Sequence, residues 1–134
     1  MTVEFRRINH FTVNAPSGEQ KKVREFYGEI LGLKEVKIPE NLLELYEIIW
    51  YELLDVRLHI EFVKNYVRPR EDYEKGVILP GRHVALEVKN IHTVRRELEK
   101  HGVPIRDAVE LSDRDRFYTI DPFGNFFEFI EFHK

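Results

Sequence analysis

The chain of 134 residues repeats one pattern of secondary structure twice, and this repeat limits the possible folds more than any other feature. Each half reads as an alternating stretch, a segment with apolar residues at helical spacing, and three further strand-like stretches. The glycines expected to end the two helices, Gly32 and Gly102, lie 70 residues apart, and the histidines of the two first strands, His10 and His83, lie 73 residues apart. The repeat therefore indicates two copies of one supersecondary unit.

In the first half, residues 8–13 (INHFTV) alternate as a strand does. The helical segment that follows starts near Ser17, whose spacing from Gln20 fits a capping box, and it stops at Gly32. Its apolar residues form one stripe, as in a helix that packs on a sheet. Further strands are expected at 33–38, 45–53 and 58–63.

The second half follows the same order. Residues 82–88 predict a strand, and residues 90–102 predict a helix with Asn90 as its N-terminal cap. The sequence DPFGN has proline second and glycine fourth, as a type I turn prefers. The remaining predictions are a short strand and turn at 103–111, a strand at 116–120, the turn at 121–125 and a closing strand at 126–132.

The expected fold is a single α+β domain over residues 1–134, with module one at 1–66, a linker at 67–80 and module two at 81–134. Neither module is expected to bury its sheet face alone, so the two should fold together. With 43% apolar residues, a chain of this length has enough side chains for a core.

Composition excludes several classes of function. The net charge of −3, with both signs mixed along the chain, gives no basic surface for nucleic acid. No apolar run is long enough to cross a membrane, and the first residues lack the apolar stretch of a signal peptide. Without cysteine there is no disulfide or thiolate chemistry. We therefore expect a cytoplasmic protein that binds neither nucleic acid nor membrane.

Five polar residues share one predicted sheet face. In the stretch LHIEFV, the apolar side chains point to one face of the strand, and His59 and Glu61 point to the other. His10 and His83 hold matching positions in the two first strands, and Glu128 stands between phenylalanines in the last strand. We expect all five on the face that no helix covers. A solvated sheet face would also carry polar residues, without any function.

These residue types suit a divalent metal ion. Neutral imidazoles and carboxylates bind Zn²⁺, Ni²⁺, Fe²⁺ or Mn²⁺, and two histidines with one carboxylate suit non-haem iron in particular. A glutamate at such a site can also act as a base. The other histidines, His92, His101 and His133, lie on an expected helix surface, at a helix end and in the C-terminal tail, and we assign them no role.

The motifs INHFTV, FYGEILGL, LHIEFV, RHVALEV and RFYTIDPFGNFFEF together resemble the vicinal oxygen chelate superfamily over nearly the whole chain. That superfamily includes glyoxalase I, extradiol dioxygenases, fosfomycin-resistance proteins, methylmalonyl-CoA epimerase and bleomycin-resistance proteins. The resemblance implies two βαβββ modules that form a U-shaped mixed sheet around a metal-binding cleft, and a homodimer.

By this resemblance, His10, His83 and Glu128 match three metal ligands of the superfamily. The fourth ligand falls in LHIEFV. Aligning this stretch with FFEFI sets Glu61 opposite Glu128, as in glyoxalase I, whereas other small members of the superfamily carry a histidine here, which favours His59. We choose His59 as the ligand, and assign catalytic roles to Glu61 and Glu128.

The resemblance also implies a small substrate with neighbouring oxygens, held by a divalent metal ion during lyase, isomerase or dioxygenase chemistry. Arg116, Tyr118 and Trp50 are the candidate substrate-binding residues. The other interpretation is a surface arginine with an aromatic ring packed beside it for Arg116 and Tyr118, and core or dimer packing for Trp50. A second reading is a metal-free protein that sequesters a drug or metabolite, as bleomycin-resistance proteins do. A third is a structural dimer with a solvated cleft.

Overall fold

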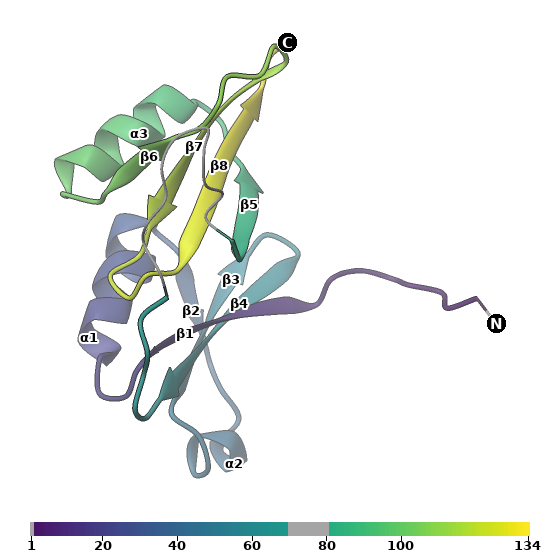
Figure 1. Cartoon of the computed structure of the whole chain (residues 1–134). Coiled ribbons are helices and arrows are strands. Elements are labelled where there is room, and N and C mark those ends of the chain that lie inside the picture. The colour runs from purple at the N-terminus through teal and green to yellow at the C-terminus, as the bar shows by residue number, and fades with distance from the viewer. Residues whose placement is uncertain (1, 70–80) are drawn as a thin grey trace. The chain divides into compact units, whose positions relative to one another are not determined.

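The computed structural model describes residues 2–69 and 81–134 (Figure 1). The chain forms two compact units, residues 1–66 and 67–134, and each unit contains one four-stranded sheet. Both units follow the order βαβββ, so the prediction of an α+β fold built from two such modules is confirmed. Most of the predicted linker, residues 70–80, lies outside the described residues.

In unit one, β1 and β4 pair in parallel, and the other neighbouring strands pair antiparallel. The strand order across the sheet is β1-β4-β3-β2. The elements are β1 (His10–Pro16), α1 (Gln20–Val23), the π-helix η1 (Arg24–Ile30), β2 (Lys34–Val36), α2 (Glu40–Leu43), β3 (Ile48–Leu53) and β4 (Val56–Val63).

Unit two repeats this arrangement. The order is β5-β8-β7-β6, with β5 parallel to β8 and the remaining pairs antiparallel. Helix α3 lies along one face of the sheet (Figure 1). The elements are β5 (His83–Glu87), α3 (Ile91–Lys100), β6 (Ile105–Asp107), β7 (Arg114–Ile120) and β8 (Phe126–Phe132).

The apolar face of each sheet packs under its helix. In unit one, Tyr27 of η1 lies against Tyr51 of β3, with ring centroids 6.0 Å apart, and both side chains are buried. In unit two, the guanidinium of Arg95 on α3 lies 5.8 Å from the centre of the Phe117 ring, which packs in turn against Phe129. The alternate residues of the same strands therefore face away from the helices.

The helix of unit one differs from the prediction in its winding. Its second part is a π-helix, in which the Leu31 N–H donates to the carbonyl of Phe26, five residues earlier, at 2.9 Å. This wider turn accompanies the burial of two consecutive aromatic side chains, Phe26 and Tyr27. The third strand starts at Ile48 and not at residue 45, because residues 40–43 form the short helix α2, which was not predicted.

Asn90 stands at the N-cap position of α3 as predicted, but neither predicted side-chain capping bond forms, and carboxylates from distant segments lie near both helix starts. The Asn90 side chain makes no capping bond; instead Glu131 of β8 accepts from the N–H groups of Asn90 (2.7 Å) and Ile91 (3.1 Å). In unit one, Glu47 accepts from Ser17 Oγ at 2.5 Å and from Gly18 N–H at 2.7 Å. A carboxylate is favourable here because the first N–H groups of a helix lack internal acceptors.

The turn at residues 121–125 is confirmed and sets the start of β8. The Gly124 N–H donates to the carbonyl of Asp121 at 3.2 Å. The buried Asp121 carboxylate accepts from the Phe123 N–H (2.9 Å), the Asn125 N–H (2.8 Å) and Asn125 Nδ2 (2.7 Å). Gly124 has φ +94°, and a Cβ there would meet Arg68 Cγ at 3.2 Å. The turn therefore fixes the strand that carries Glu128.

Candidate functional site

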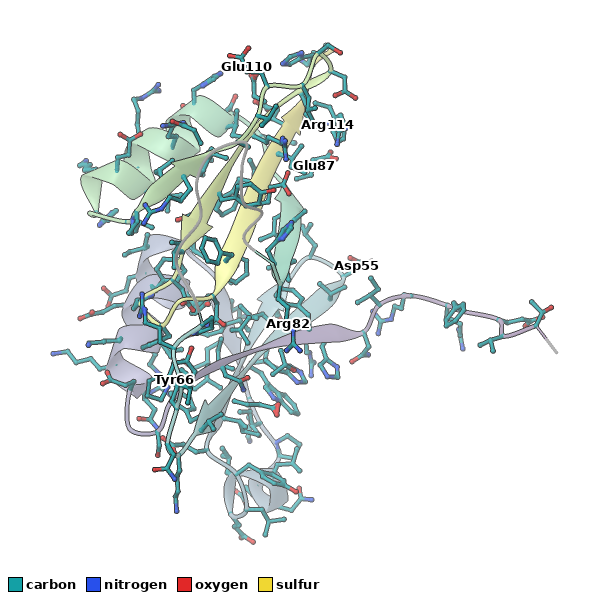
Figure 2. The ribbon with its side chains drawn as sticks, in the orientation of Figure 1. Asp55, Tyr66, Arg82, Glu87, Glu110 and Arg114 are labelled. Carbon is teal, nitrogen blue, oxygen red and sulfur yellow. The ribbon has the colours of Figure 1, made fainter. Side chains whose placement is uncertain are left out.

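Unit one brings His10, His59 and Trp50 into one stack of rings. The His59 ring lies between the other two, with centroids 3.9 Å from His10 and 4.4 Å from Trp50, and both pairs are within 12° of parallel. Three neighbouring strands place them, since Thr12 of β1 and Trp50 of β3 both pair with His59 of β4. The stack borders a hollow of about 560 Å³, which is also lined by Asp55 of the β3–β4 turn. Figure 2 labels Asp55.

Each histidine of the stack, taken separately, has a ring nitrogen that can bind a cation. His10 Nδ1 lies 2.9 Å from Asn9 Oδ1, which only accepts hydrogen bonds, so Nδ1 carries the proton and Nε2 presents its lone pair. Burial, with the charges of neighbouring His10 and Arg57, lowers the pKa of His59 to about 4. His59 is therefore the neutral imidazole that metal ligation requires.

Unit two brings His83 and Glu128 together. His83 Nδ1 lies 2.9 Å from the Gly81 carbonyl oxygen, so it donates there and leaves the lone pair on Nε2. That Nε2 lies 3.2 Å from Glu128 Oε1. Two atoms that both accept hydrogen bonds repel each other unless a second ring proton or a cation lies between them.

This donor pair fits a divalent metal ion. At metal–ligand distances of about 2.1 Å and angles of about 90–110°, two ligand atoms lie about 3.0–3.4 Å apart. The separation of His83 Nε2 and Glu128 Oε1, 3.2 Å, falls in that interval. The hydrogen bond from Nδ1 to a carbonyl is also the contact that orients most histidine ligands.

The other oxygen of Glu128 faces Arg116. Arg116 Nη1 lies 3.3 Å from Glu128 Oε2 and 3.4 Å from the hydroxyl of Tyr118. The Tyr118 ring stands edge-on to His83, at 5.3 Å between centroids. Glu128 is therefore surrounded by three other predicted site residues on the sheet face away from α3, namely His83, Arg116 and Tyr118.

The strand registers show which residue of LHIEFV matches Glu128. In unit one, Thr12 lies two residues after His10 and pairs with His59 of β4. In unit two, Ala85 lies two residues after His83 and pairs with Glu128 of β8. His59 is thus the structural equivalent of Glu128, and the alignment that set Glu61 opposite Glu128 is wrong by two residues. Glu61 lies on the same face as His59, two residues further along β4, and is exposed.

Each unit by itself assembles two of the four predicted ligands. Across residues 2–69 and 81–134, the structure shows no group of three or more His, Cys, Asp or Glu side chains placed to hold an ion. Two groups that orient the histidines, the Asn9 side chain and the Gly81 carbonyl, were not predicted from the sequence. Because Asn9 directly precedes His10 in the sequence, its role in orienting the His10 ring could have been predicted. None of the described helices is long and apolar enough to cross a membrane.

Comparison with known proteins gives the family. Residues 7–129 match the profile of the Glyoxalase/Bleomycin resistance protein/Dioxygenase superfamily. Among curated protein sequences, none matches this chain. A crystal structure of a protein described as belonging to the glyoxalase family, from Bacillus anthracis, is 32% identical with a TM-score of 0.83, and the match covers 99% of this chain and 100% of that one.

Two more distant structures share the fold. A glyoxalase/dioxygenase from Nostoc punctiforme is 19% identical with a TM-score of 0.76, and the match covers 96% of this chain and 92% of that one. An antibiotic binding protein from Streptomyces sp. CB03234 is 16% identical with a TM-score of 0.68, over 98% and 100% of the two chains. The family match and the 32% identity together show that this chain belongs to the Glyoxalase/Bleomycin resistance protein/Dioxygenase superfamily.

Proposed function

We propose that this protein is a divalent-metal-dependent enzyme of the glyoxalase/dioxygenase type, acting on a small substrate with two neighbouring oxygens. The reaction would be a lyase, isomerase or dioxygenase reaction, and the ion Zn²⁺, Ni²⁺, Fe²⁺ or Mn²⁺. The proposed ligands are His10, His59, His83 and Glu128. The observation that carries the proposal is the approach of His83 Nε2 to Glu128 Oε1, because their separation of 3.2 Å matches that of two ligand atoms on one divalent ion.

The chain's own groups would bind the substrate and move protons. A bound divalent ion would supply Lewis-acid polarisation of the substrate oxygens. Glu61 is exposed on the face of β4 that carries His59, so its carboxylate is free to accept a proton from a substrate there. Trp50 ends the ring stack, and with Tyr118 it is proposed to contact the substrate.

The test is metal analysis of protein purified without chelator, together with thermal unfolding in the presence of each ion. We expect the wild type to hold metal and to melt at higher temperature with the ion it prefers, because an ion that binds only the folded state stabilises it. His59→Ala and His83→Ala should both lose this response. His92→Ala is the matched control, since His92 is exposed on α3 and pairs with Asp115. Less than about a tenth of an equivalent of metal, with no thermal shift, would contradict the proposal.

The alternative is a metal-free protein that binds a drug or metabolite. Two observations favour it: the fold is shared with an antibiotic binding protein, and the His10–His59–Trp50 stack offers flat ring surface for an aromatic ligand. Binding of bleomycin, measured by calorimetry, separates the two readings. Affinity that His83→Ala leaves unchanged, in protein free of metal, would favour this alternative.

We further propose that the protein works as a homodimer in the cytoplasm. Several large apolar side chains are exposed in the described part of the chain, among them Phe5 and Ile8 of the N-terminal segment, and a second copy would cover such surface. Light scattering tests this proposal, and a monomer at micromolar concentration would contradict it.

A further inference from the structure

Arg116 of β7 is a half-buried cation that pairs with Glu128. Only 18% of the Arg116 side chain is exposed, and only 9% of that of Glu128. Within the described residues, Glu128 is the one carboxylate within ion-pair distance of Arg116. Because a buried charge without a partner is strongly unfavourable, the two side chains hold each other in place.

The guanidinium is itself fixed by the backbone. Arg116 Nη2 donates to the Val109 carbonyl at 3.0 Å, and Nη1 is the group that faces Glu128 Oε2. Its Nε is buried and meets no acceptor among the described residues. The planar fork is therefore anchored at Nη2 and presents Nη1 to the carboxylate, leaving the guanidinium little freedom to turn toward a substrate.

The two oxygens of Glu128 consequently have different surroundings. Oε2 faces Arg116, whereas Oε1 faces His83 Nε2. A cation that binds beside His83 meets Oε1 first, and it shares the single negative charge of the carboxylate with the guanidinium.

We infer that Arg116 is a positioning residue for Glu128: it holds Oε2, presents Oε1 alone beside His83, and competes with a bound cation for the carboxylate charge. The part of this inference that concerns a cation rests on the proposed function. A guanidinium within a few ångströms repels a divalent ion, so Arg116 keeps the ion weakly held and restricts Glu128 to one ligand atom.

The test compares the wild type with Arg116→Met, Arg116→Lys and Arg114→Met, using Co²⁺ as the probe. Arg114 is the matched control because it lies two residues earlier on the same strand, pairs with Asp113 and is more exposed (Figure 2). We expect Arg116→Met to bind Co²⁺ at least about tenfold more tightly. Its visible Co²⁺ absorption should also change, since Oε2 becomes free to bind the ion. Arg114→Met should change the affinity far less than Arg116→Met, because Arg114 acts on Glu128 through its charge without a direct contact. Arg116→Lys, which keeps the charge, should restore the wild-type affinity.

The outcomes separate this inference from the proposed function. If the wild type binds Co²⁺ and Arg116→Met shows the same affinity and spectrum, the inference is overturned and the proposed function stands. If the wild type binds none of the metals, the proposed function fails, and a double-mutant cycle of Arg116→Met and Glu128→Gln in urea unfolding decides the inference. The double variant should then unfold at about the urea concentration of the less stable single variant. Additive losses would show that the two residues do not act as a pair.

Discussion

Replacing Asp121 by alanine should strongly destabilise the protein. Among the described residues, its buried carboxylate accepts hydrogen bonds from the Phe123 N–H, the Asn125 N–H and Asn125 Nδ2, at 2.7–2.9 Å. Alanine removes all three acceptor contacts and leaves the donors inside a turn whose neighbours are largely buried. The perturbation therefore acts on the connection between β7 and β8, the strands that carry Arg116, Tyr118 and Glu128.

The magnitude follows from the kind of bond that is lost. A hydrogen bond to a charged group is worth about 1.5–3 kcal/mol, but three bonds to one carboxylate do not add, and water partly replaces those at the half-buried Asn125. We therefore expect Asp121→Ala to cost about 3–4 kcal/mol. Asp121→Asn keeps Oδ1 as the acceptor for both N–H groups, and the Asn125 amide can turn over to face the new donor. That variant should cost about 1 kcal/mol.

Urea unfolding followed by circular dichroism measures both variants. With a urea dependence of about 1.5 kcal/mol/M, the loss in Asp121→Ala corresponds to a midpoint about 2–3 M lower than that of the wild type. A loss below about 1 kcal/mol would refute the reasoning, because the three bonds would then contribute no more than a surface contact. Equal losses in the alanine and asparagine variants would refute it as well, since the retained acceptor would have no value.

Two further predictions concern helix α3 and the core of unit one. Backbone N–H groups at the start of α3 lower the pKa of Glu131, and the hydrogen bond from Ile91 has the largest effect. The carboxylate therefore stabilises the folded state at pH values above its unfolded pKa. This contribution is lost as the pH falls through the lower pKa of the folded state. The urea midpoint of Glu131→Gln should accordingly lie below that of the wild type at pH 7 and approach it in acid; a constant difference across this pH range would contradict the prediction. Burial raises the pKa of Tyr51 to about 12, and its buried hydroxyl has no hydrogen-bond partner in the described residues. Tyr51→Phe should therefore leave the free energy of unfolding unchanged or raise it by up to about 1 kcal/mol, as measured by thermal unfolding. A clear loss of stability would show that the hydroxyl has a partner.

Local sequence patterns predicted the elements well where the signal was itself local. The closing strand at 126–132 has the predicted bounds, and the turn before it follows from the positions of Pro122 and Gly124. Gly32 and Gly102 both have positive φ directly after their helices, as a helix-ending glycine does. Each of these features depends on a few consecutive residues, so the sequence alone contains it.

Features that depend on distant residues were missed. The carboxylates near the starts of α1 and α3 belong to Glu47 and Glu131, which lie 30 and 41 residues from Ser17 and Asn90, so no local pattern indicates them. The π-helical winding at Arg24–Ile30 has the same apolar stripe as an α-helix would have, and hydrophobic spacing does not separate the two.

The sequence predicted which sheet face carries the candidate residues, but not how they pair. Alternation along β4 placed His59 and Glu61 on one face, and the structure agrees. Motif alignment could not decide which of them corresponds to Glu128, because the answer depends on the register of β4 against β1. Similarly, Arg116 was predicted as a substrate-binding residue because of its charge. Its contact with Glu128 was not predicted, because that contact depends on the pairing of β7 with β8.

The matching registers of the two sheets have a consequence for how such a protein changes during evolution. His59 and Glu128 occupy one backbone position in two copies of the same unit, as do Trp50 and Tyr118. In a duplicated fold of this kind, the backbone fixes where a side chain lies but not which side chain it is. The substitution of one residue can therefore replace an imidazole by a carboxylate while the strand pairing stays the same. Descendants of one ancestor could thereby acquire new preferences for ions and substrates while their folding stayed the same.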